Sequence, residues 1–200
     1  MKRINPALAA DVEQFRKASW KWLLGRVDYL QRNRSVPGAI NAGNYKNRSL
    51  FLVGEMFLYH YDPKHKDTLP YYDTFPLVIP IKIYDDGFLG LNLHYLPYEL
   101  RIGFLNKLLD LAFTPPGDTR TRLKINYELL RDSTKFNAFI PCLKRYLVDH
   151  VRGRMMKIQP HEWLMAVYLP IANWRATNDK RGMTQREVWR DSMRKIRNRK

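Results

Sequence analysis

The stretch 77-LVIPIKIYDDGFLGLNLHYLP-97 decides the expected fold. Two runs rich in β-branched and aromatic residues flank Asp85-Asp86-Gly87, and Asp-Gly is a strong signal for a type I′ hairpin turn. Pro80 has no N–H to donate, so the first arm is expected at the edge of its sheet. We therefore predict a β-hairpin around residues 77–97, within a small, twisted antiparallel sheet.

The residues on either side of the hairpin predict two more strands. Residues 50–59 have high β propensity, and residues 152–159 are expected to form a short return strand. Residues 33–49 contain many Pro, Gly and Asn residues and no periodicity, which is typical of a linker. Residues 122–131 fit a helix and a strand equally well, so the pattern leaves both open.

Several helices are expected to cover this sheet. Residues 9–32 form an amphipathic pattern, and further helices are predicted over 98–113, over 134–151 with a kink at Pro141, and from Pro160 to a stop at Pro170. The apolar stripe of the first helix consists of Val12, Phe15, Ser19, Trp22, Leu23, Val27 and Leu30. That of the second consists of Leu100, Phe104, Leu108 and Leu111. The expected fold class is α+β, a small antiparallel sheet packed with helices.

The C-terminal segment combines many charges with a helical pattern. Thr184 and Glu187 have the spacing of a capping box, in which Thr is the N-cap and Glu stands three residues later. Trp189, Met193 and Ile196 follow at four- and three-residue steps, so they share one face of the predicted helix. An apolar face opposite basic residues predicts a helix that docks on protein through these three side chains.

Charge is unevenly distributed along the chain. The net charge is +16, and residues 175–200 contain ten basic and three acidic residues, whereas residues 51–99 contain three basic and seven acidic ones. Residues 1–34 are also basic, with eight basic and three acidic residues. We expect an N-terminal amphipathic helix (1–34), an α+β core (50–174) and a basic C-terminal helical arm (175–200). Basic helical arms at both ends are typical of a protein that binds a polyanion or acidic neighbouring subunits.

No catalytic, metal or cofactor site is expected from the sequence. No phosphate-binding glycine loop occurs, and the motif at His161-Glu162 has Met165 where a zinc protease needs its second histidine. The acids Asp62, Asp73 and Asp85 could bind a metal in a nuclease, but Asp is also the expected residue of turns. With a single cysteine, Cys142, the chain cannot form an internal disulfide, and neither a secretory signal nor a membrane span is predicted.

One block of the sequence resembles a known family. Residues 57–101 are similar to a region in proteins of large contractile-tailed bacteriophages described as DNA end protectors or minor virion proteins. A weaker similarity covers PHEWLMAVYLP (160–170) and VWRDS (188–192). The residues that carry the main resemblance are Tyr61-Asp62-Pro63-Lys64, Leu69-Pro70-Tyr71-Tyr72-Asp73, Phe75-Pro76-Leu77-Val78, Gly87-Phe88-Leu89-Gly90-Leu91-Asn92 and His94-Tyr95-Leu96-Pro97. The resemblance implies a virion protein assembled in the host cytoplasm as part of a large hetero-oligomer, and it brings no catalytic residues.

Three functions follow from charge and resemblance together. The first is a non-enzymatic component of a phage particle whose basic arms contact DNA or acidic virion proteins, with protection of packaged DNA ends as part of that role. The second is a purely protein-contacting subunit of the tail, baseplate or neck (the head–tail connector). The third is a metal-dependent nuclease. The residues expected to contact the polyanion are Arg175, Lys180, Arg181, Arg186, Arg190, Arg194, Lys195, Arg197, Arg199 and Lys200.

Overall fold

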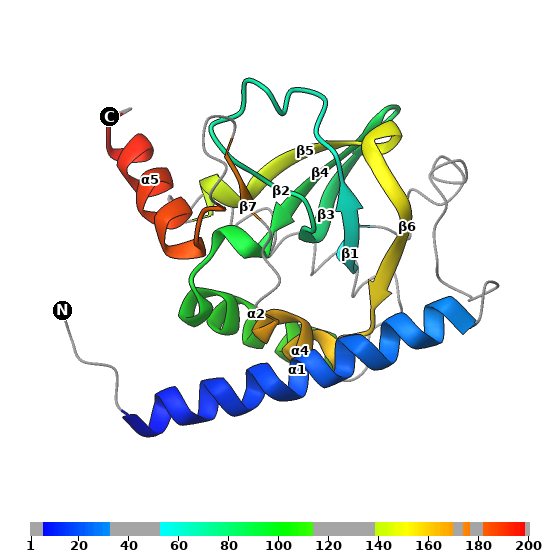
Figure 1. Ribbon diagram of the computed structural model, residues 1–200, viewed down its shortest axis with the longest axis vertical. Helices are drawn as coiled ribbons and strands as arrows, with labels where there is room; N and C mark the ends of the chain where they lie inside the picture. The colour runs from blue at the N-terminus through cyan, green and yellow to red at the C-terminus, as the bar shows by residue number, and fades with distance from the viewer. Residues whose placement is uncertain (1–5, 33–52, 114–138, 170–173, 177–181, 199–200) are drawn as a thin grey trace.

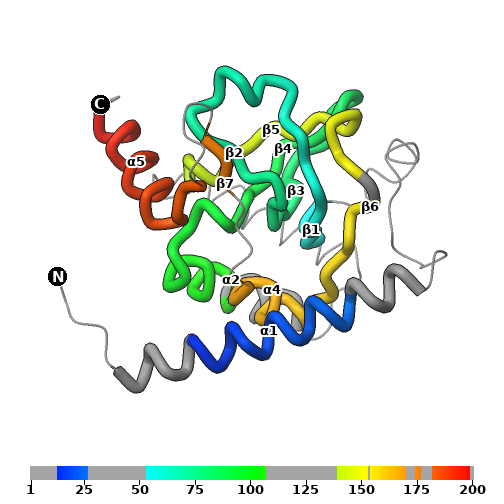
Figure 2. Tube along the Cα trace, viewed as in Figure 1, coloured from blue at the N-terminus to red at the C-terminus, as the bar shows by residue number. Residues whose placement is uncertain are grey.

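The computed structural model describes residues 6–32, 53–113, 139–169, 174–176 and 182–198 (Figure 2). The linker at 33–49, the segment 122–131 and the basic residues Lys180, Arg181, Arg199 and Lys200 lie outside the described residues. The described part is an α+β structure with a curled, half-barrel-like antiparallel sheet. Helices α1, α2 and α4 lie together at one end of the sheet, and helix α5 lies at its side (Figure 1).

The main sheet has five strands in the order β5-β4-β3-β1-β6. Their bounds are β1 Met56–Tyr61, β3 Leu77–Tyr84, β4 Gly87–Asn92, β5 Leu143–Leu147 and β6 Val151–Ile158. The predicted hairpin is confirmed as β3 and β4, and the predicted return strand as β6. A second sheet pairs β2 (Tyr72–Asp73) with β7 (Trp174–Arg175).

The hairpin turn differs from the expected type. Tyr84 pairs with Gly87, so Asp85 and Asp86 form the two-residue loop. A type I′ turn needs positive φ at both loop positions. Gly54 is the only described residue with positive φ, so the type I′ prediction was wrong. Gly87 serves packing instead, because a Cβ there would overlap the carbonyl oxygen of Tyr146 on the neighbouring strand β5.

The position of Pro80 also corrects the prediction from sequence. Strand β3 lies in the middle of the sheet, not at its edge. Pro80 is tolerated because β1 pairs with β3 only through Phe57 and Leu58, before the chain reaches this proline. Beyond that point the Pro80 carbonyl accepts a hydrogen bond from Gly54 N at 3.0 Å, and a register shift follows between Pro80 and Lys82. The N–H that Pro80 lacks therefore falls where regular pairing between β3 and β1 has ended.

Within residues 134–151, the part that the structure describes is a strand between short turns, so the helix prediction was wrong there. Pro141 lies in the 3₁₀ turn η4 (Ile140–Cys142), and β5 follows at once along β4. A second 3₁₀ turn, η5 (Val148–His150), leads directly into β6. β5 and β6 are therefore neighbours in sequence but lie at opposite edges of the sheet, which requires the sheet to curl.

Both faces of the sheet are buried. Met56 and Leu58 of β1 belong to one apolar cluster, and the alternate residues Phe57, Tyr59 and Tyr61 belong to another. This alternation is expected because successive strand residues point to opposite faces. The first cluster also contains helix residues, whereas the second is rich in aromatic rings from the strands.

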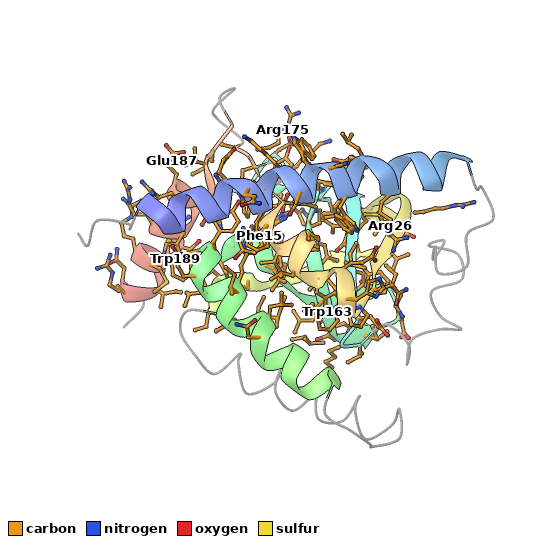
Figure 3. All side chains as sticks on the ribbon, turned by 90° about the horizontal axis from the view of Figure 1, so that it is seen from below. Phe15, Arg26, Trp163, Arg175, Glu187 and Trp189 are labelled. Carbon is orange, nitrogen blue, oxygen red and sulfur yellow. The ribbon has the colours of Figure 1, made fainter. Side chains whose placement is uncertain are left out.

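Helix α1 (Pro6–Arg32) confirms the predicted N-terminal helix and packs against α4 (Trp163–Tyr168). Ser19 and Leu23 of its predicted stripe are buried, and Phe15 stacks on Tyr168 with ring centroids 4.9 Å apart. Arg26 lies at the other end of this contact (Figure 3). Helix α4 continues from the 3₁₀ turn η6 (Pro160–Glu162), which confirms that a helical segment begins at Pro160.

Helix α2 (Tyr98–Phe113) confirms the helix predicted after Pro97, and of its predicted stripe Phe104 faces the core but Leu100 does not. Phe104 and Leu105 are buried, whereas Leu100 is 38% exposed. The adjacent Arg101 is 1% exposed and takes the place expected for Leu100. None of the described helices is long and apolar enough to span a membrane.

Candidate nucleic-acid interface

Helix α5 (Gln185–Arg197) begins with the predicted capping box. Glu187 N donates to Thr184 Oγ1 at 3.3 Å, and Thr184 N donates to Glu187 Oε2 at 2.8 Å. These contacts satisfy backbone donors that a helix N-terminus leaves without partners. The C-terminal basic segment therefore contains a defined helix, as predicted.

The core-facing side of α5 is centred on Val188 and Ser192, which are both buried. Ser192 Oγ lies 2.8 Å from Tyr71 Oη, and Gln185 Nε2 donates to the Leu96 carbonyl at the other end of the helix. The predicted docking residues Trp189, Met193 and Ile196 lie beside Val188 and Ser192 on the helix, and all three are half-buried. Trp189 packs against the core of its own chain, so α5 is attached to the domain in the absence of a partner.

The opposite side of α5 is basic and exposed. Asp191 is bonded to two cations of the helix, Arg194 at 2.7 Å and Lys195 at 2.6 Å. Arg175, in β7, is exposed as well. The predicted polyanion-binding residues that are exposed on α5 are Arg186, Arg190, Arg194, Lys195 and Arg197, of which Lys195 lies near the core-facing side, over the Tyr71 ring.

A pocket of about 520 Å³ lies beside α5. It is bounded by the loop around 63–72, by the ends of β4 and the 3₁₀ turn η3 (Leu93–Tyr95), and by β5. Tyr71 joins pocket and helix, because its ring lines the pocket while Lys195 Nζ lies 4.9 Å from the ring centroid. The remaining tyrosines of the lining are Tyr61, Tyr72, Tyr95 and Tyr146.

Sequence reasoning missed this pocket. Its lining comes from positions between 61 and 147, and no spacing rule connects residues that far apart. The density of tyrosines between 59 and 72 was the one available signal. The β5 wall of the pocket could not be foreseen either, because residues 134–151 were predicted as a helix. Lys144 and Tyr146 line the pocket as part of strand β5.

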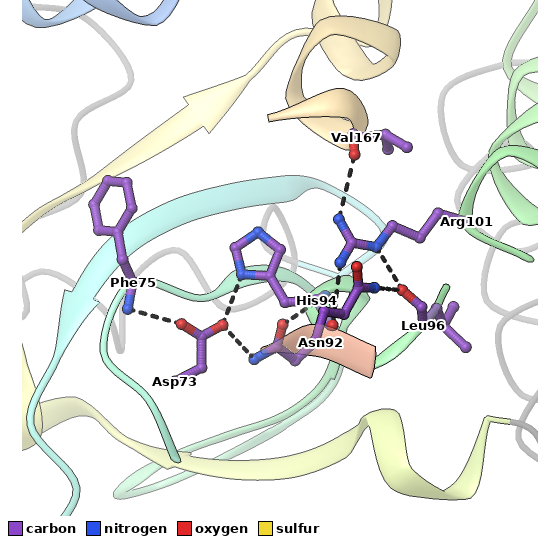
Figure 4. Close-up of polar contacts among 8 residues, drawn as sticks. Asp73, Phe75, Asn92, His94, Leu96, Arg101 and Val167 are labelled. Carbon is purple, nitrogen blue, oxygen red and sulfur yellow. Dashed lines mark hydrogen bonds and ion pairs between the residues drawn. The ribbon is translucent and has the colours of Figure 1, made fainter. Parts of the chain in front are cut away.

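A buried polar network supports the pocket wall (Figure 4). Asp73 Oδ1 accepts from Phe75 N at 3.0 Å, which confirms the turn role predicted for Asp73. Its Oδ2 accepts from Asn92 Nδ2 at 3.1 Å and lies 2.7 Å from His94 Nδ1. Burial lowers the pKa of His94 below its ordinary 6.5 and outweighs the opposing effect of the Asp73 carboxylate. His94 is therefore neutral at pH 7, and its Nδ1–H donates to Asp73.

Arg101 joins this network to the helices (Figure 4). Its guanidinium donates to three backbone carbonyls, those of Leu96 at 2.8 Å, His94 at 3.1 Å and Val167 at 3.3 Å. Burial lowers the pKa of Arg101 from 12.5 to about 10, so the side chain remains charged at neutral pH. Arg101 therefore holds η3, the start of α2 and the end of α4 together.

Lowering the pH is expected to destabilise the protein through His94. Because burial depresses the folded pKa, the unfolded chain takes up a proton at His94 below pH 6.5 that the folded protein does not. The unfolding free energy should therefore fall from pH 6.5 downward, by up to about 1.4 kcal/mol per pH unit for this group. Urea unfolding between pH 7.5 and 5.5 measures this slope. H94Q should flatten it and the exposed control H161Q should not; equal slopes for wild type and H94Q would contradict the assignment.

Two of the acids considered for a nuclease, Asp62 and Asp73, are engaged by other groups. Asp62 contacts Lys66 at 3.0 Å and Arg152 at 3.1 Å, and Asp73 is held in the network above. Across the described residues, no group of three or more His, Cys, Asp and Glu side chains is arranged to hold a metal ion. Burial raises the pKa of Cys142 to about 12, so this residue is a thiol rather than a nucleophilic thiolate.

Comparison with known protein families gives a match over most of the chain. Residues 43–192 match the family model described as Phage T4 terminal DNA protecting protein. The match covers the sheet, the pocket, α2, α4 and the first half of α5, but not α1. No curated protein and no solved structure shows significant similarity to the chain.

Proposed function

The chain belongs to the family of the phage T4 terminal DNA protecting protein, and we propose that it is a non-enzymatic virion component that binds and shields the ends of packaged DNA. The observation that carries this proposal is the family match, which covers residues 43–192 of the 200-residue chain. That range includes the pocket and two of the exposed basic residues of α5, Arg186 and Arg190.

We propose that protection results from occupying the DNA end rather than from a reaction on it. The engagement of Asp62 with Lys66 and Arg152, and of Asp73 with Asn92 and His94, supports this view. Carboxylates held in this way have fewer oxygens available to bind the divalent ions that nucleases use.

Helix α5 is the part of this protein that we assign to the phosphate backbone. Its exposed arginines are carried on a helix that its own cap and its contacts with Tyr71 and Leu96 hold in place. Arginine and lysine contacts to phosphates provide affinity without reading bases, which suits a protein that must bind any end it meets. Other virion proteins are the expected partners of α5's half-buried residues Trp189, Met193 and Ile196.

A nuclease challenge tests the proposed function. Linear duplex DNA is incubated with the protein and then treated with an exonuclease, while a parallel sample is cut with an endonuclease at a central site. We expect the protein to slow the exonuclease strongly and leave the central cut unaffected. Equal exonuclease digestion with and without protein would contradict the proposal. Inhibition of both enzymes to the same degree would show uniform coating of the DNA and would also contradict it.

A further inference from the structure

We propose, on the basis of the proposed function, that the pocket beside α5 receives the terminal nucleotide of a DNA strand, with tyrosine rings contacting the base and Lys144 binding the 5′-phosphate. The volume of about 520 Å³ falls within the range of small-molecule sites, roughly 300–1,000 Å³. A duplex is too wide for such a space, so the nucleotide must leave its base pair to enter.

The rings in the pocket wall suit a base of any sequence. Tyr71 and Tyr72 are half-buried, so their rings are partly accessible. Tyr95 and Tyr146 are nearly fully buried and form the deeper wall. Stacking on aromatic side chains tolerates every base because each base has a π face. The pocket therefore fits an unpaired base better than it fits a duplex.

Lys144 is the cation best placed for a phosphate. Its Nζ lies 4.1 Å from the centroid of the Tyr95 ring and within ion-pair distance of no carboxylate among the described residues. The next residue, Arg145, is already engaged, because it pairs with Asp86 and stacks over Tyr84. A phosphate would thus supply the counter-charge that Lys144 lacks, whereas Arg145 already has one.

The electrostatic environment of Lys144 agrees with this role. Burial, with a smaller contribution from Lys195 on α5, lowers its pKa to about 8. Two groups near Lys144 are neutral at pH 7, because burial raises the pKa of Tyr95 well above 10 and that of Cys142 to about 12. An entering anion would meet Lys144 and Lys64 in the lining. The two carboxylates of the lining are engaged, Asp73 with Asn92 and His94 and Asp86 with Arg145.

The position of α5 argues for a DNA end rather than a free nucleotide. Tyr71 contacts both Ser192 and Lys195 of the helix while its ring lines the pocket. Phosphates bound along the basic side of α5 would therefore lead the strand toward the pocket. A free nucleotide shares the base and phosphate chemistry but makes no use of this helix.

The experiment compares two lysine variants on DNA with different ends. K144Q removes the pocket cation, and K82Q is the matched control, because Lys82 also lies over a tyrosine ring (Tyr84, 5.2 Å) but does not line the pocket. Affinities are measured for 5′-phosphorylated linear duplex, the same duplex after phosphatase treatment, closed circular duplex and free deoxynucleoside 5′-monophosphate. Wild type should prefer the phosphorylated end over the other three ligands by about tenfold or more. K144Q should lose this preference and keep its affinity for the circle, while K82Q should match wild type.

The outcomes separate this inference from the proposed function. If wild type protects ends against exonuclease but K144Q protects them equally and keeps the phosphate preference, the pocket assignment alone is wrong. A free monophosphate that binds as tightly as the DNA end would also overturn it. If wild type protects no ends, both proposals fail. A second measurement uses only wild type: 2-aminopurine at the terminal position should change its fluorescence on binding, and the same base ten nucleotides inward should not.

Discussion

R101M is expected to lower the unfolding free energy by about 3–5 kcal/mol. The substitution would leave the carbonyls of His94 and Val167 without this donor, whereas the Leu96 carbonyl would lose Arg101 but keep Gln185. Each buried acceptor without a partner costs about 1–3 kcal/mol. The methionine also avoids the free-energy cost of burying a charged guanidinium, which offsets part of the loss. That burial lowers the pKa of Arg101 to about 10 reflects this desolvation cost.

The neighbouring residue provides the control for this prediction. L100A changes the position that the periodicity assigned to the core, but Leu100 is 38% exposed, so we expect a loss below about 1 kcal/mol. Urea denaturation of both variants, with the m-value checked against wild type, measures the difference. A loss for R101M no larger than that for L100A would show that the guanidinium does not hold the helices to η3.

Reversing the charge of the α5 arginines is expected to weaken duplex binding by about 100-fold or more at low salt. R186E/R190E/R197E changes three exposed residues and leaves Asp191 with its two cations. If each arginine contacts one phosphate, the slope of log K against log salt should become shallower by about three, since each contact contributes about 0.9. Filter binding of a random-sequence duplex over a salt series measures both quantities.

A matched variant separates a local contact from a general charge effect. K17E/K21E/K82E changes the net charge by the same amount, at exposed residues of α1 and β3. We expect it to retain most of the salt slope. Equal losses in both variants would contradict the assignment of α5, and failure of wild type to bind duplex at low salt would favour the purely protein-contacting alternative. Circular dichroism of R186E/R190E/R197E should show that α5 remains helical. Of its three changes only R197E places a negative charge at the C-terminal end of the helix, where it costs about 0.3–1 kcal/mol.

The elements that the sequence predicted correctly are those whose signals are local. The cap at Thr184, the periodicity of α1 and the two runs around Asp85-Asp86 each depend on residues within a few positions of one another. Such signals act before any tertiary contact forms, so they can be read from one chain.

The errors share a different origin, in contacts between distant residues. Strand β5 has no strong pattern of its own and is fixed by pairing with β4 about fifty positions earlier, for example Leu91 with Leu143. Pro80 fits a central strand only because β1 ends its pairing before it. Arg101 is buried because three carbonyls from other elements converge on it.

The candidate site divides in the same way. The basic helix was visible in composition and periodicity, and five of the predicted cations are exposed on it. The pocket was not visible, because a loop, η3 and β5 meet there only after the sheet has curled. The roles of Arg186, Arg190 and the other α5 residues in binding remain predictions for the experiments above.

The packing of α1 on α4 has a consequence for how the chain matures on the ribosome. Trp22 donates to Glu162, 140 positions later in the chain, so helix α1 packs against a segment that is synthesised well after it. At about 5–20 residues per second, the ribosome needs about 7–28 s to produce that segment. During this time Leu23 and its neighbours on α1 have no native partner, and chaperones can bind them. A chain truncated before Trp163 would lack α4, so the apolar side of α1 around Leu23 would stay exposed. We expect such a chain to aggregate or to be degraded.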